Sequence, residues 1–241
     1  MITEESLRAI EELGIEIDHD VAFGGKSKGN QHLRRSAALA RYLAQKVGAN
    51  VAVAVAGSWL HDTALPSGND YDYDTNKEIV LALLRDIDMS QHDREAAAEC
   101  VASHEGTVAP KSLEAQVVHD VDVLEKAGIL GIIRHTWKLT NSGKIDAKNV
   151  TSVDCDTVCD HVAWRQRQLR TDEARRLSAI VSAPLLDDTV VMAIVKLSAK
   201  RASQGVITEK IAQELQSVIP HRAYSVLRYQ LNQDYLKGES L

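Results

Sequence analysis

Hydrophobic residues follow a helical spacing along most of this chain. In residues 4–13 the leucine and isoleucine positions lie three apart, which places them on one face of a helix. Residues 31–47 repeat the pattern between Asn30, a suitable N-cap, and Gly48, a common residue at helix ends. Further helices are expected over residues 51–63, 75–86, 90–104 and 112–132.

One of these segments has a second interpretation. The alternation of valine and alanine over residues 51–56 would also fit a strand. We favour helix, because alanine is a poor strand former and neither a turn nor a partner strand follows. The next two helices have possible capping boxes, Thr75 with Glu78 and Ser90 with Asp93, in which the acidic residue follows three positions after the hydroxyl.

The last part of the chain continues the helical pattern. It contains three or four more helices, with N-caps expected at Thr171 and Thr208. The sequence therefore predicts an all-α fold, a helical bundle with additional C-terminal helices. We expect residues 1–150 to form one domain and residues 151–241 a helical extension, which could pack on the same core.

The composition limits both the residue types expected in the core and the classes of partner that the protein could bind. Of the 241 residues 44% are hydrophobic and only 4% aromatic, so we expect closely packed helices around Ala, Val, Leu and Ile. The net charge of −6 argues against nucleic acid as a partner. The odd number of cysteines indicates reduced thiols, and the acidic N-terminus does not resemble a targeting peptide. With no apolar run of membrane-spanning length, we expect a soluble cytoplasmic protein.

The dipeptide His61-Asp62 carries the strongest chemical signal. It closes the apolar segment and lies between His32 upstream and Asp120 downstream. Two imidazoles and two carboxylates suit Mn, Fe, Co, Ni or Zn, provided that the fold brings them together. Adjacent residues on a helix point about 100° apart, so His61 and Asp62 can share an ion only above the seam between them.

This ordered set resembles the pattern H…HD…D of the HD superfamily of metal-dependent phosphohydrolases. Arg35 completes the family's HxxR, and His104 lies in the segment VASHEG. The segment HDVDVLEKAGILGI (residues 119–132) resembles the family's D-A-D-x-L-[DE], with Asp120 at the ligand position. The resemblance covers residues 28–135.

The resemblance implies an all-α metal-dependent phosphohydrolase. It would use one divalent ion (Mn, Co, Ni, Fe, Zn or Mg) to activate water against a small phosphorylated molecule, such as a nucleotide. Asp62 would also orient the water, and His104 would act as general acid or phosphate donor. Arg35, with Lys26 and Lys28 from the preceding loop, would bind the substrate phosphate. The implied metal ligands are His32, His61, Asp62 and Asp120.

Several of these residues have other interpretations. Arg35 would equally fit an ion pair, and His104 would fit a cap at a helix C-terminus. Asp70, on the loop after the His-Asp pair, could assist the water. Asp122 is expected at the surface or behind the ligands, and His119 is expected to be structural.

Other functions also fit the sequence. The fold could serve as a regulatory or ligand-binding module without turnover. A di-iron oxygenase would resemble HDxxH, but Leu65 stands at the third position after the pair, which favours a single metal ion. A homodimer is expected by family analogy alone.

Overall fold

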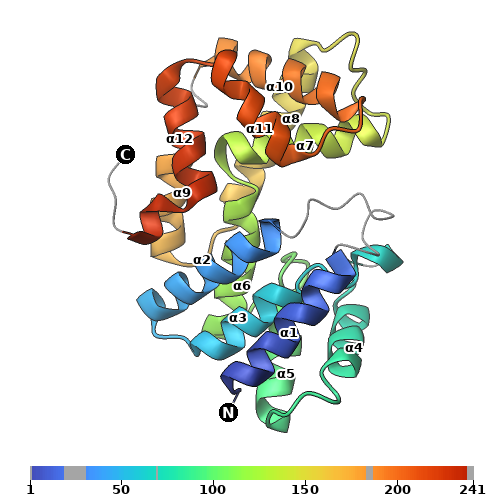
Figure 1. The fold of residues 1–241 in the computed structure, drawn as a ribbon, viewed down its shortest axis with the longest axis vertical. Coiled ribbons are helices and arrows are strands. Elements are labelled where there is room, and N and C mark those ends of the chain that lie inside the picture. Colours follow the sequence, from blue (N-terminus) through green and yellow to red (C-terminus); the bar gives the residue numbers. More distant parts are fainter. Residues whose placement is uncertain (1, 19–30, 69, 183–186, 238–241) are drawn as a thin grey trace. The chain divides into compact units, whose positions relative to one another are not determined.

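The computed structural model describes residues 2–18, 31–68, 70–182 and 187–237 (Figure 1). Within these ranges the protein has twelve α-helices, three short 3-10 helices and no strand, which confirms the predicted all-α fold. The expected N-cap Asn30 and the loop lysines Lys26 and Lys28 lie outside the described residues. The α-helices are α1 (Glu4–Glu16), α2 (Gln31–Val47), α3 (Val51–Leu60), α4 (Tyr73–Leu83), α5 (Gln91–Ala102), α6 (Leu113–Glu125), α7 (Gly128–Asn141), α8 (Ser152–Gln166), α9 (Asp172–Ser182), α10 (Asp188–Ala202), α11 (Thr208–Glu214) and α12 (His221–Asn232). The 3-10 helices are η3 (Leu65–Ser67), η5 (Leu215–Ser217) and η6 (Asp234–Lys237).

The helices form two compact units. The first comprises residues 1–122 and 170–174, and the second comprises residues 123–169 and 175–241. The chain leaves the first unit inside α6, so the boundary near residue 150 expected from the sequence falls within the second unit. The contacts of α7 with α8 belong to that unit and continue across residue 150.

The first unit is built around α3. This helix contacts α1, α2 and α5, and all of its residues from Val53 to Leu60 are buried. A helix that is apolar on every side is stable only when neighbours cover it completely. The side chain of Asn50 caps its start by accepting hydrogen bonds from the amides of Ala52 and Val53. The valine–alanine alternation is therefore helix, and the strand interpretation is excluded.

The second unit has α7 at its centre. This helix contacts α8, α10, α11 and α12, and its isoleucines 129, 132 and 133 are fully buried. Valines, leucines and alanines of the surrounding helices complete an aliphatic core, as the low aromatic content predicts. None of the described helices combines the length and hydropathy needed to cross a bilayer.

Candidate metal centre

Three separate segments of the first unit bring two histidines and two aspartates together. His32 lies in the first turn of α2, His61 and Asp62 directly follow α3, and Asp122 lies on α6. The two Nε2 atoms of His32 and His61 face each other at 3.0 Å. The side chain of Asp122 is fully buried, and its Oδ1 lies 3.6 Å from Nε2 of His61 and 3.9 Å from Nε2 of His32.

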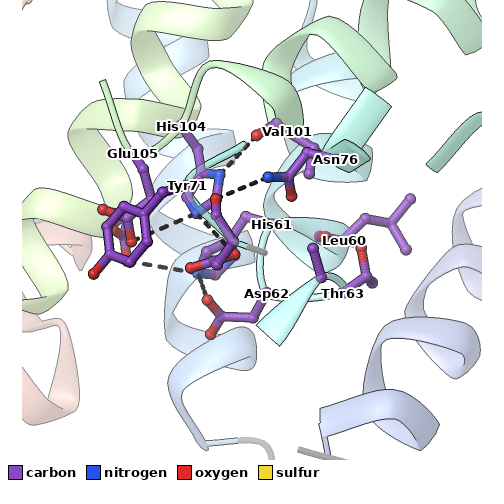
Figure 2. Close-up of polar contacts among 12 residues, drawn as sticks. Leu60, His61, Asp62, Thr63, Tyr71, Asn76, Val101, His104 and Glu105 are labelled. Atoms are coloured by element: carbon purple, nitrogen blue, oxygen red, sulfur yellow. Dashed lines mark hydrogen bonds and ion pairs between the residues drawn. The ribbon is translucent and has the colours of Figure 1, made fainter. Parts of the chain in front are cut away.

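Asp62 lies between the same two imidazoles. Its Oδ2 is 3.5 Å from Nε2 of His32, and its Oδ1 is 3.4 Å from Nε2 of His61. Figure 2 shows Asp62 directed toward the His61 ring. The predicted sharing of one position by this sequential pair is therefore geometrically feasible, because both side chains converge on the space above their seam.

Hydrogen bonds fix which nitrogen of His61 faces the cluster. Its Nδ1 lies 2.8 Å from the carbonyl oxygen of Ser58, which can only accept, so Nδ1 carries a proton. In the neutral ring Nε2 then offers a lone pair to the other side chains. This is the tautomer and orientation of a metal-ligating histidine whose second nitrogen is held by a backbone carbonyl.

The distances fit a divalent cation. Two nitrogen ligands at about 2.1 Å from one ion, at right angles to each other, lie about 3.0 Å apart. The separation of the two Nε2 atoms has this value.

The charges around His61 also favour a cation. Burial lowers the pKa of His61, but the charges of Asp62 and Asp122 outweigh this effect and raise the pKa to about 9. The cluster therefore favours positive charge strongly, even inside the protein.

Asp120 does not face this cluster. Its Oδ1 accepts a hydrogen bond from the amide of Arg170 (2.7 Å), and its Oδ2 accepts from the amide and hydroxyl of Thr171 (2.8 and 2.7 Å). Burial raises its pKa, and these hydrogen bonds partly offset the effect. Two residues along a helix correspond to a rotation of about 200°, so Asp120 and Asp122 point to nearly opposite sides of α6. Asp122, expected at the surface or behind the ligands, occupies the place expected of Asp120.

A third histidine adjoins the cluster. His104, fully buried after α5, has Nδ1 2.6 Å from the carbonyl oxygen of Val101, and its ring lies 5.4 Å from that of His61. Its Nε2 is 3.8 Å from Oδ1 of Asp70 and 3.8 Å from Oε1 of Glu105. Figure 2 shows His104 and Glu105 beside His61. Burial lowers the pKa of His104, so the neutral ring presents Nε2 as an acceptor.

The remaining predicted residues are placed as follows. Arg35 is buried on α2, one turn after His32. Asp70 is buried and belongs to the cluster through His104, whereas Glu105 was not singled out from the sequence. Nδ1 of His119 lies 2.7 Å from the carbonyl oxygen of His104, a structural contact that holds the loop carrying that histidine.

The ligand atoms form three overlapping groups. In each group they lie within 4.8 Å of one another, and neighbouring groups share Asp62 or His104. Buried clusters of this composition are consistent with metal binding. The groups are His32, His61 and Asp62; Asp62, Asp70 and His104; and His104, Glu105 and Asp122.

Comparison with known proteins identifies the family of the segment that carries this cluster. Residues 30–127 match the HD domain family. This part of the chain is therefore an HD domain, as its sequence resemblance predicts.

The fold is similar to those of bacterial proteins of known structure. A Lactobacillus plantarum protein solved by structural genomics shares 26% identity, with a TM-score of 0.60 over 77% of this chain and 94% of that chain. Bacillus subtilis YpgQ shares 18% identity, with a TM-score of 0.59 over 77% of this chain and 92% of its own. YpgQ in complex with ADP gives 19% identity and the same TM-score and coverage. No curated protein matches the chain.

Proposed function

We propose that this protein is a metal-dependent phosphohydrolase that acts on a small phosphorylated molecule, with nucleotides as the first candidates. The observation that supports the proposal most strongly is the convergence of two imidazole Nε2 atoms and two carboxylates on one buried position. The binding of ADP by YpgQ, a protein of similar fold, supports a nucleotide as substrate.

His32, His61, Asp62 and Asp122 would hold the cation in this proposal. A divalent ion supplies two things there: a lower pKa for the water that it binds, and positive charge opposite a phosphoryl oxygen. Asp62 is the least enclosed of the four, with 11% of its side chain exposed, so it can both ligate and orient an incoming water. Asp122 replaces Asp120 in the ligand set.

The roles of the neighbouring side chains follow from their protonation. The sequence predicts His104 as a general acid or phosphate donor, but its lowered pKa and its Nδ1 contact leave Nε2 as a proton acceptor. We therefore propose that His104 accepts a proton or a ligand bond. Arg35, with Lys26 and Lys28, remains the proposed phosphate-binding group, because a guanidinium fork matches phosphate oxygens.

The test is release of phosphate and pyrophosphate from a panel of nucleotides and phosphomonoesters. The purified protein is stripped of metal and resupplied with Mn, Co, Ni, Zn or Mg. Turnover should require metal and fall at least about 100-fold in Asp62→Ala, which removes a ligand, and in Asp122→Asn, which removes the negative charge of one. Asp74→Asn, an exposed carboxylate on α4, is the matched control and should retain activity. Nucleotide binding without turnover under every metal would instead identify a ligand-binding module.

A further inference from the structure

An aromatic side chain that reaches solvent borders the candidate metal centre. Tyr71 is 55% exposed, although it directly follows Asp70, whose buried carboxylate lies 3.8 Å from Nε2 of His104. In the view of Figure 2 the ring of Tyr71 lies on the same side of His104 as Glu105. A single exposed ring needs no explanation by itself. Its place next to the cluster and the way in which its backbone is held do need one.

The backbone that carries this ring is held by side chains at three successive residues. Oγ1 of Thr107 donates to the carbonyl oxygen of Tyr71 (3.1 Å). Nδ2 of the buried Asn76 donates to the carbonyl oxygens of Asp70 (2.8 Å) and Asp72 (2.9 Å) on either side. Carbonyl oxygens of a surface loop can be satisfied by water, so these side-chain donors indicate that the conformation of the loop itself is fixed. The exposed ring is therefore positioned before any ligand binds.

The same hydrogen bonds connect the ring to two parts of the cluster. Tyr71 follows Asp70 by one residue, and its partner Thr107 follows Glu105 by two. Asp70 and Glu105 each place an oxygen 3.8 Å from Nε2 of His104. Tyr71 is thus held where the two loops that carry these carboxylates meet.

The charges at this edge indicate which part of a phosphorylated molecule could lie against the ring. The carboxylates of Asp70 and Glu105 repel phosphate, whereas the cation position at His32 and His61 attracts it. A fixed aromatic ring instead suits a flat, uncharged group. In a nucleotide this group is the base, which stacks on aromatic side chains through its π face.

We propose that Tyr71 is the surface on which the base of a nucleotide substrate stacks, while the phosphates point toward the cation position. This inference rests on the proposed function, because it names the substrate class of the same site. Every base has a π face, so such a surface accepts purines and pyrimidines alike. The expected substrates are therefore nucleotides with any base, and phosphorylated molecules without a base should bind more weakly.

The experiment is calorimetric titration of the Mn²⁺-loaded full-length protein with two ligands that contain the same phosphorus–carbon–phosphorus group. One is α,β-methylene-ADP, and the other is methylenediphosphonate, which lacks the nucleoside. The wild type should bind the nucleotide analogue more tightly. Tyr71→Ala should weaken binding of the analogue about 5- to 150-fold and affect methylenediphosphonate much less.

Two further variants separate stacking from other effects. Tyr71→Phe keeps the ring without the hydroxyl and should bind the analogue like the wild type. Trp164→Ala removes another exposed aromatic side chain, on α8, and is the matched control that should also bind it like the wild type.

Three results would overturn the stacking surface. They are equal binding of the two ligands by the wild type, unchanged binding of the analogue in Tyr71→Ala, and an equal loss for both ligands in that variant. The last result would mean that the substitution disturbs the cation position instead of a base contact. An equal loss in Tyr71→Phe and Tyr71→Ala would count against stacking too, because it would assign the effect to the hydroxyl.

The outcomes also distinguish this proposal from the proposed function. Binding of the analogue that depends on the Tyr71 ring, without turnover of any nucleotide, would support the stacking surface and count against the phosphohydrolase. Nucleotide hydrolysis with the same KM in Tyr71→Ala as in the wild type would support the phosphohydrolase and overturn the stacking surface.

Discussion

Two aspartates on α6, Asp120 and Asp122, contact different groups although only one residue separates them in the sequence. Asp122 faces the imidazoles of His32 and His61, whereas Asp120 accepts three hydrogen bonds from Arg170 and Thr171. The first carboxylate meets groups that can bind a cation. The carboxylate of Asp120 accepts hydrogen bonds from backbone amides at the start of α9, which have no acceptor within the helix.

Substitution of Asp120 should therefore lower stability, whereas substitution of Asp122 should weaken metal binding. Asp120→Ala removes the acceptor of two backbone amides and should lower the free energy of unfolding by about 2–4 kcal/mol. Asp122→Asn should keep the fold but weaken Mn²⁺ binding at least about tenfold. Urea unfolding of the metal-free variants measures the first effect, and calorimetric titration with Mn²⁺ measures the second. Loss of metal by a stable Asp120→Ala variant would reverse the assignment.

The sequence predicts the residue types of the proposed metal site better than it predicts which aspartate of α6 faces the two imidazoles. His32, His61 and Asp62 lie together as the ordered pattern indicates. Asp120 and Asp122 both fit the spacing of the last motif, and the choice between them depends on how α6 is rotated. That rotation brings Asp120 to amides 50 residues later in the chain, and no local pattern contains this information.

Metal binding should depend steeply on pH because of His61. Its pKa of about 9 in the metal-free protein means that a proton must leave before Nε2 can bind a cation. The apparent Mn²⁺ affinity should rise up to about tenfold per pH unit between pH 7 and 9. Titration calorimetry in two buffers of different ionisation enthalpy should detect a released proton near pH 7.5. A Mn²⁺ affinity that does not change between pH 7 and 9 would show that His61 is not protonated in the metal-free protein.

The same pKa sets the pH dependence of the metal-free fold. The folded-state pKa lies above the ordinary value of 6.5, so protonated His61 contributes stability that is complete below pH 6.5. This contribution should disappear as the pH rises through about 9. Metal binding should remove this loss, because the cation takes the place of the proton between the carboxylates.

At the scale of the helices, the packing of α1 on α3 depends on one glycine. A Cβ atom at Gly14 would lie 2.3 Å from the carbonyl oxygen of Trp59, and this backbone atom cannot move aside without shifting α3. Because His61 and Asp62 directly follow Trp59 and Leu60, this contact also supports the segment that carries these two proposed metal ligands.

Replacement of Gly14 should therefore disturb the packing of α1 on α3 and lower the stability of the protein. Gly14→Ala should destabilise the protein by about 1–3 kcal/mol, although alanine favours helix in isolation. Thermal unfolding followed by circular dichroism measures the change, with Glu12→Ala, an exposed position on α1, as the matched control. An unchanged or higher melting temperature in Gly14→Ala would show that α1 and α3 do not approach so closely.

The N-caps of the helices show where the local sequence is sufficient to predict the start of a helix and where it is not. Ser90 caps α5 as predicted, through its hydroxyl and the amide of Asp93, and the hydroxyl of Thr171 accepts from the amide of Ala174. The predicted box of Thr75 with Glu78 is wrong, because Asp72 caps α4 and accepts from the amide of Thr75. Thr208 is the first residue of α11 rather than its cap. Several polar residues in a row offer competing caps, and tertiary contacts choose among them.

At the scale of the whole molecule, the first unit is discontinuous. Residues 170–174 belong to it, although the 47 residues from 123 to 169 lie in the second unit. The hydrogen bonds of Asp120 connect this returning segment to α6. A domain boundary at residue 150, as the sequence suggests, would separate Asp120 from its partners.

Fragments can test this dependence. A fragment of residues 1–150 should melt at a lower temperature than a fragment of residues 1–174, because only the longer one contains the partners of Asp120. Introducing Asp120→Ala into the longer fragment should remove the difference. Circular dichroism at matched concentration provides the comparison. Equal melting temperatures for the two unmodified fragments would show that the returning segment contributes nothing to the first unit.

The discontinuity also has a consequence for synthesis. A ribosome that adds about 5–20 residues per second needs roughly 2–10 seconds to make the 47 residues between Asp122 and the returning segment. During that interval the nascent chain already holds every proposed metal ligand, yet the amides that Asp120 requires do not exist. The order of translation therefore delays completion of the first unit until much of the second has been made.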